Sequence, residues 1–139
     1  MRLFLDTSVL LAASGSAAGA SRELFRRASA NAWVLVSSPY VLEEVFRNLP
    51  SLPPAANVEW ARLRPALMVM HDVLTLDRPA VFQAAKDRPI LFSALAWADI
   101  LLTLDRDDFG GLLDKAFYGL LVLKPGVFLQ RERAAGKLK

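Results

Sequence analysis

Residues 100–105 read Ile100-Leu101-Leu102-Thr103-Leu104-Asp105, an apolar run that ends in an acid. Four more short apolar runs occur along the chain, at 3–5, 33–36, about 69–76 and 120–123. Continuous apolar runs, rather than alternating ones, are typical of parallel strands that are covered on both faces. Because helical patterns separate the runs, the sequence predicts an α/β fold with right-handed crossovers between four or five parallel strands.

The helical patterns are expected at 21–30, 39–49 and 58–63, and over 81–98 in two pieces that join at Asp87. Ser38 can cap the second of these helices, which stops before Pro50. The tripeptide Asp-Arg-Pro begins at Asp77 and again at Asp87, and this pattern places an aspartate at a helix cap with proline in the first turn.

The composition indicates one well-packed domain. The chain has 139 residues, of which 54% are hydrophobic, and we expect a single domain over 1–129 followed by a basic, flexible tail over 130–139. Cysteine is absent, which excludes disulfides, thiolate metal sites and cysteine nucleophiles. His71 is the single histidine, which argues against a histidine-rich zinc site and weakens any Ser-His-Asp proposal. The formal net charge of +3 leans mildly towards anionic partners.

The apolar segments are not those of a leader or a membrane span. Asp6 interrupts the apolar N-terminal segment 3–20, and Asp99 interrupts the segment 90–104, which is also too short to cross a bilayer. We therefore expect a cytoplasmic protein without membrane contact.

Two acids directly follow apolar runs. Asp6 follows the first run and Asp105 follows the fourth. Ligands bind at the carboxyl ends of strands in an open parallel sheet, and a carboxylate there is costly unless solvent, a cation or hydrogen bonds receive it. Either acid alone is explained as well by helix capping, but two on different strands favour a cation site. Asp87 begins a helix, so capping is the stronger interpretation there, and Asp77 has the same interpretation without supporting context.

Glu43 and Glu44 lie almost symmetrically about the apolar stripe of the helix at 39–49, so the helical period cannot choose between them. Glu43 has Arg47 at i+4, which favours a surface ion pair. Glu44 has Asn48 one turn on, a polar neighbour that can line a site, and this gives Glu44 a slight preference.

Four segments in this order resemble the PIN domain: 3–10, 38–45, 87–91 and 98–105. The resemblance covers nearly the whole chain. It implies a three-layer α/β/α fold and a Mg²⁺- or Mn²⁺-dependent endoribonuclease that hydrolyses RNA phosphodiester bonds. Many family members are toxins of VapBC-type toxin–antitoxin pairs and many form homodimers, so the resemblance also implies a cognate antitoxin and a homodimer.

The resemblance also implies a set of site residues. The acidic quartet falls on Asp6, Glu44, Asp87 and Asp105, and the hydroxyls near the metal on Thr7, Ser8 and Thr103. The fourth motif, Asp105-Arg106-Asp107-Asp108-Phe109, is one residue longer than usual, so Asp107 or Asp108 holds the extra role, and we include Asp108 among the metal ligands. Four arginines are candidates for phosphate contacts or for a merely solvated helix face: Arg22, Arg26, Arg27 and Arg106.

These residue types fit the implied chemistry. Mg²⁺ and Mn²⁺ take oxygen ligands, which a carboxylate cluster supplies together with charge balance. Two ions about 3.5–4 Å apart can activate water and stabilise the leaving oxygen of an in-line displacement. No protein nucleophile is needed, in agreement with the absence of cysteine.

Other classes fit less well. A phospho-acceptor receiver needs adjacent acids after its first strand, where this chain has Thr7 after Asp6. A haloacid-dehalogenase-type phosphatase needs an acid two residues past Asp6, where Ser8 stands. A catalytically idle PIN-like module for binding or assembly is the alternative function, although binding alone does not require four acids.

Overall fold

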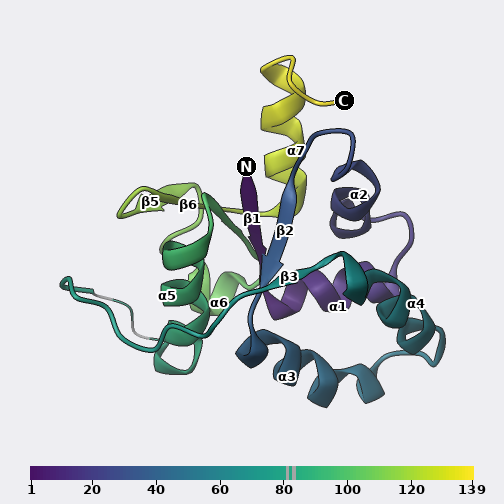
Figure 1. The fold of residues 1–139 in the computed structure, drawn as a ribbon, viewed down its shortest axis with the longest axis horizontal. Helices are drawn as coiled ribbons and strands as arrows, with labels where there is room; N and C mark the ends of the chain where they lie inside the picture. The colour runs from purple at the N-terminus through teal and green to yellow at the C-terminus, as the bar shows by residue number, and fades with distance from the viewer. Residues whose placement is uncertain (81, 83) are drawn as a thin grey trace.

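A central mixed sheet organises the chain (Figure 1). The computed structural model describes residues 1–80, 82 and 84–139. The strands run in the order β3-β2-β1-β4-β6-β5, and their bounds are β1 (Arg2–Leu5), β2 (Val34–Ser37), β3 (Met68–Val69), β4 (Ile100–Leu102), β5 (Lys115–Phe117) and β6 (Leu120–Leu123). All neighbouring strands are parallel except β5 and β6. The predicted α/β class is confirmed, with one antiparallel edge strand added.

Helices cover both sides of this sheet, with α5 on one side and α1, α2 and α4 on the other (Figure 1). Their bounds are α1 (Thr7–Gly15), α2 (Ala20–Arg27), α3 (Pro39–Asn48), α4 (Ala55–Leu63), α5 (Arg88–Trp97), α6 (Arg106–Phe109) and α7 (Pro125–Ala134), with 3-10 turns at η1 (Leu49–Ser51), η2 (Arg64–Ala66) and η3 (Ala85–Asp87). The described helices and strands thus form the expected α/β/α layers. Within the described residues, no helix has both the length and the apolar character needed to cross a membrane.

The register of the central strands brings the ends of β1 and β4 to one edge. Leu3 pairs with Ile100 and Leu5 with Leu102, and the backbone N–H of Asp6 donates to the carbonyl of Leu102 at 3.1 Å. Both strands are buried on both faces from Leu3 to Leu5 and across Ile100 to Leu102. Burial of these apolar side chains therefore fixes where the acids after each strand emerge.

Two strand predictions need correction. The third run, expected over 69–76, forms only the two-residue strand β3, which ends at Val69. Beyond it the chain leaves the sheet, and the Asp72 carboxylate accepts from the backbone N–H of Tyr40 at 3.1 Å. Strand β5 was not predicted from the sequence. It pairs with β6 through a two-residue turn in which Tyr118 and Gly119 have φ of 49° and 87°, as a type I′ hairpin requires.

The helix predictions at 21–30, 39–49 and 58–63 correspond to α2, α3 and α4, with α4 beginning three residues earlier than expected. The second piece expected over 81–98 is α5, and it begins directly after Asp87, where η3 ends. The first piece is wrong as a helix, because only the 3-10 turn η3 forms and Phe82 and Ala84 are not helical, while residues 81 and 83 lie outside the described residues.

Asp77 caps no helix and lies at a bend, so that prediction is wrong. Contacts with the β5–β6 turn hold this segment instead: the Arg78 guanidinium lies 5.2 Å from the centre of the Tyr118 ring, and the Tyr118 hydroxyl donates to the carbonyl of Pro79.

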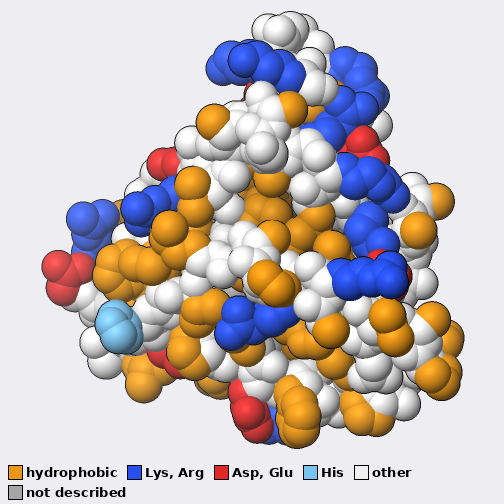
Figure 2. All heavy atoms as spheres, turned by 45° about the vertical axis from the view of Figure 1, so that its right-hand side comes forward, with side chains coloured by type: hydrophobic (Ala, Val, Ile, Leu, Met, Phe, Trp, Pro, Cys, Tyr) orange, Lys and Arg blue, Asp and Glu red, His pale blue; other side chains and the backbone are white. Residues whose placement is uncertain are grey.

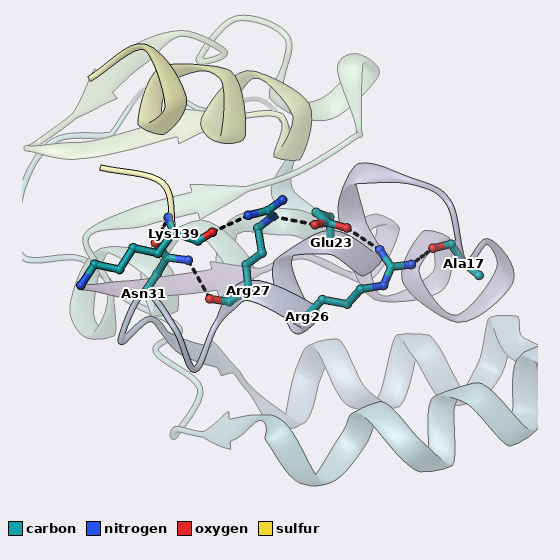
Figure 3. Close-up of polar contacts among 6 residues, drawn as sticks. All are labelled: Ala17, Glu23, Arg26, Arg27, Asn31 and Lys139. Carbon is teal, nitrogen blue, oxygen red and sulfur yellow. Dashed lines mark hydrogen bonds and ion pairs between the residues drawn. The ribbon is translucent and has the colours of Figure 1, made fainter. Parts of the chain in front are cut away.

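Part of the C-terminal segment that was expected as a tail is helical. Residues 130–134 belong to α7, because Phe128 and Leu129 are buried and anchor this helix on the core. Beyond α7 the chain folds back on α2, where Lys139 donates its backbone N–H to Asn31 Oδ1 at 2.9 Å and accepts from Arg27 (Figure 3).

Candidate metal centre

Asp6 is the most buried acid of the site. Its side chain is 3% exposed and it stands where β1 ends and α1 begins. The carboxylate accepts from the Thr7 N–H at 2.6 Å, the Ser8 hydroxyl at 2.9 Å and the Thr103 hydroxyl at 2.6 Å. Burial nevertheless dominates and raises the pKa of Asp6 to about 6.

The two hydroxyls that face Asp6 tie it to the end of β4. Ser8 Oγ accepts from the Leu104 N–H at 3.0 Å, and Thr103 Oγ1 accepts from the Asp105 N–H at 3.0 Å. Each hydroxyl therefore has its direction set by a backbone donor. The turn that carries Asp105 is in this way held against Asp6.

Glu44 reaches the same place from α3. The hydroxyl of Thr7 donates to Glu44 Oε1 at 2.8 Å, whereas Glu43 is exposed on the outer side of the helix. The structure thus brings Glu44 rather than Glu43 to Asp6. Asn48 does not line the site, because its amide donates to the backbone carbonyl of Glu44 at 2.7 Å.

Asp87, Asp105 and Asp108 form the second half of the site. Each offers a carboxylate oxygen, and these oxygens lie within 4.8 Å of one another. Asp105 caps α6 and accepts from the Asp108 N–H at 2.9 Å, so the first turn of α6 points both acids the same way. Asp107 is exposed and is not part of this group, so Asp108, rather than Asp107, lies beside Asp87 and Asp105.

Asp87 has an unusual environment. It is 4% exposed, and among the described residues its Oδ2 has no hydrogen-bond partner. Burial, the neighbouring carboxyl of Asp108 and the charge of Asp6 raise the pKa of Asp87 to about 8, while the Asp87 carboxyl and the Lys86 ammonium lower that of Asp108. Burying a carboxylate oxygen without a hydrogen-bond donor is costly unless a proton or a cation receives it, so this oxygen is a candidate cation ligand.

The two halves of the site adjoin. The charge of Glu44 acts on Asp6, that of Asp6 acts on Asp87, and both Glu44 and Asp87 act on the hydroxyl of Tyr40, whose pKa is raised mainly by burial. Crowded carboxylates, two of them buried, repel one another until a proton or a cation enters. Oxygen donors of this kind and number suit a hard divalent ion, so the residues present fit Mg²⁺ or Mn²⁺.

The arginines of α2 are not brought to the acids. Arg22 donates to the carbonyl of Ala13 and pairs with Glu59 at 2.9 Å, and Arg26 and Arg27 both pair with Glu23 (Figure 3). Glu59 and Glu23 already pair with these three arginines, so a phosphate group would have to compete with the glutamates for them.

Basic side chains also extend along the top and right-hand side of the face in Figure 2, so positive charge on the chain is not confined to α2. Arg106 is exposed in the first turn of α6, beside Asp105.

Sequence reasoning missed two residues at the rim. The Lys86 ammonium pairs with Asp108 at 3.2 Å, and the hydroxyl of Tyr40 donates to the backbone carbonyl of Lys86. The sequence indicates these two residues only by their closeness to predicted site acids: Lys86 precedes Asp87, and Tyr40 lies one helical turn before Glu44.

The chain matches no protein-family model and no curated protein. Its structure is similar to a crystal structure of VapBC2 from Rickettsia felis bound to a DNA fragment from their promoter, with 14% identity, a TM-score of 0.63, and coverage of 88% of this chain and 97% of that chain. VapC20 from Mycobacterium tuberculosis, described as a Sarcin-Ricin loop cleaving toxin, is 22% identical over 78% of this chain and 94% of that chain, with a TM-score of 0.48. The likeness to VapBC2 confirms the PIN-type fold.

Proposed function

We propose that the protein is a Mg²⁺- or Mn²⁺-dependent endoribonuclease. The observation that carries this proposal is the meeting of Asp6, Glu44, Asp87, Asp105 and Asp108 from four separate segments at one edge of the sheet. Helix capping accounts for backbone hydrogen bonds of Asp6 and Asp105, but not for the burial of Asp6 and Asp87 with raised pKa values.

The residues have distinct parts in the proposed site. Asp6, Asp87 and Asp105 hold the ion, with Glu44 and Asp108 completing its oxygen ligands. When bound, the ion lowers the pKa of a water molecule and stabilises charge on the leaving oxygen. The hydroxyls of Ser8 and Thr103 keep the Asp6 carboxylate in one orientation. Because the carboxylate is already oriented, no further loss of conformational entropy is needed to orient it during the reaction.

Protonation couples to this arrangement. The raised pKa of Asp87, about 8, means that this carboxyl holds a proton near neutral pH in the protein without metal, and a cation that takes the carboxylate releases that proton. Metal binding is therefore expected to tighten as the pH rises towards 8.

The proposed context is a toxin–antitoxin pair acting in the cytoplasm. The fold it shares with a VapBC2 structure supports an antitoxin partner, and the family resemblance supports RNA as substrate and a homodimer. A phosphate backbone would be repelled by the acids until metal reverses the sign of the local charge, so RNA binding and cleavage should depend on the ion together.

The test uses purified protein and a broad RNA pool with Mn²⁺, with a chelator as the negative condition. Asp105→Asn removes a proposed ligand, and Asp107→Asn is a matched control, because Asp107 is exposed and outside the cluster. We expect cleavage by the wild type and by Asp107→Asn, and none by Asp105→Asn or with chelator.

An enzyme that is selective for one cellular RNA could leave the purified pool intact. Expression of the same variants in a bacterial host, followed by sequencing of RNA 5′ ends, detects cleavage of such an RNA. Absence of wild-type cleavage sites in both assays would favour the catalytically idle binding module.

A further inference from the structure

Among the described residues, Lys86 makes the only ion pair with the acidic cluster formed by Asp87, Asp105 and Asp108. Its ammonium lies 3.2 Å from Asp108 Oδ2, and the charges of Asp87 and Asp105 also act on it. These are the same three carboxylates whose oxygens lie within 4.8 Å of one another. A cation already belonging to the chain thus stands at the place proposed for a divalent ion.

A hydrogen bond holds the backbone at Lys86, while the Lys86 side chain is largely exposed. The 3-10 turn η3 turns Asp87 inward and leaves the Lys86 side chain 72% exposed, and the Tyr40 hydroxyl binds the Lys86 carbonyl. Ion pairs this exposed contribute little to stability, so the ammonium can leave the cluster at low cost without disturbing the fold.

We propose that Lys86 is a tethered counter-cation that competes with the divalent ion for the Asp87–Asp105–Asp108 carboxylates and so sets the metal affinity of the site. In the protein without metal, the ammonium offsets part of the repulsion between these acids. A divalent ion that binds the same oxygens displaces it, because Asp108 cannot serve both cations with the same lone pairs and the two positive charges repel. This inference rests on the proposed function.

The test is a calorimetric titration of the metal-free protein with Mn²⁺, comparing the wild type with Lys86→Met. Lys115→Met is the matched control: Lys115 is an exposed lysine on β5, so its replacement makes the same change in net charge. Lys86→Arg keeps the charge beside the cluster. Thermal unfolding in chelator establishes that each variant folds, and unfolding with Mn²⁺ gives a second readout of binding.

We expect Lys86→Met to bind Mn²⁺ about two- to fivefold more tightly than the wild type, the size of one exposed ion pair. Lys115→Met and Lys86→Arg should stay close to the wild type, and the difference should shrink as ionic strength rises. Equal affinities of Lys86→Met and Lys115→Met, or weaker binding by Lys86→Met, would overturn the inference alone. Absence of saturable Mn²⁺ binding by the wild type would overturn the metal site itself and this inference with it.

Discussion

Replacement of Asp6 by asparagine should change the pH dependence of stability in a defined direction. In the folded protein the pKa of Asp6 is raised from 3.8 to about 6, chiefly by burial. Between these two pH values the carboxyl holds its proton when folded and loses it when unfolded. The free energy of unfolding of the wild type therefore falls as pH rises through this window and levels off above it.

The size of the effect follows from the same shift. A pKa moved from 3.8 to about 6 corresponds to about 3 kcal/mol of lost stability above pH 6, and asparagine removes this loss. Against it stands a constant cost of about 1–2 kcal/mol, because an amide cannot accept from all three donors that surround Asp6. Asp6→Asn should thus be less stable than the wild type near pH 4 and more stable by about 1–2 kcal/mol at pH 7.5.

Urea unfolding of the metal-free proteins at several pH values from 4 to 8 measures this difference. Asp87 titrates in both proteins, but its contribution cancels only in part, because the charge of Asp6 is one of the causes that raise the pKa of Asp87. Asp77→Asn is a matched control for the loss of one carboxylate, because the Asp77 side chain is 91% exposed. A difference between Asp6→Asn and the wild type that does not change with pH would refute the assignment of a burial penalty to Asp6. With Mn²⁺ present, the wild type should gain thermal stability and Asp6→Asn should not.

Two further substitutions separate the roles of neighbouring residues. Glu44→Gln should lower RNA turnover at least tenfold, about 1.4 kcal/mol of barrier, whereas Glu43→Gln should leave turnover unchanged in the same assay, and the reverse pattern would move the ligand by one residue. Thr103→Val keeps the side-chain shape but removes the 2.6 Å donor to Asp6, so urea unfolding at pH 7.5 should show a loss of about 1–3 kcal/mol. Thr75→Val, at an exposed threonine, should stay within about 0.5 kcal/mol, and an equal effect of the two would contradict the buried hydrogen bond.

The sheet and two of its acids could be predicted because strand burial leaves a plain pattern. Asp6 and Asp105 follow continuous apolar runs, and parallel strands end at the same edge. Strand β5 could not be predicted, since it has three residues of mixed polarity and depends on pairing with β6. Helical period could not choose between Glu43 and Glu44, because the choice depends on the Thr7 hydroxyl, which comes from another segment.

The contacts of the basic residues could be predicted from the sequence only in part. The sequence leaves Arg26 and Arg27 open between phosphate contacts and a solvated helix face, although Glu23 stands three and four residues before them, a spacing at which oppositely charged side chains pair on a helix. Lys86 was not predicted at all. Its ion pair joins η3 to Asp108 of α6, a segment about twenty residues later in the chain. No local sequence pattern predicts a contact between two such segments.

Anomalous diffraction from crystals of the protein soaked with Mn²⁺ locates the ion directly. We expect a peak among Asp6, Asp87 and Asp105, with carboxylate oxygens at roughly the 2.0–2.6 Å typical of Mg²⁺ and Ca²⁺ sites, and no peak there in Asp105→Asn. A cluster that stays empty at millimolar Mn²⁺ in the wild type, or an ion bound only elsewhere on the chain, would contradict the metal centre on which the proposed ribonuclease depends.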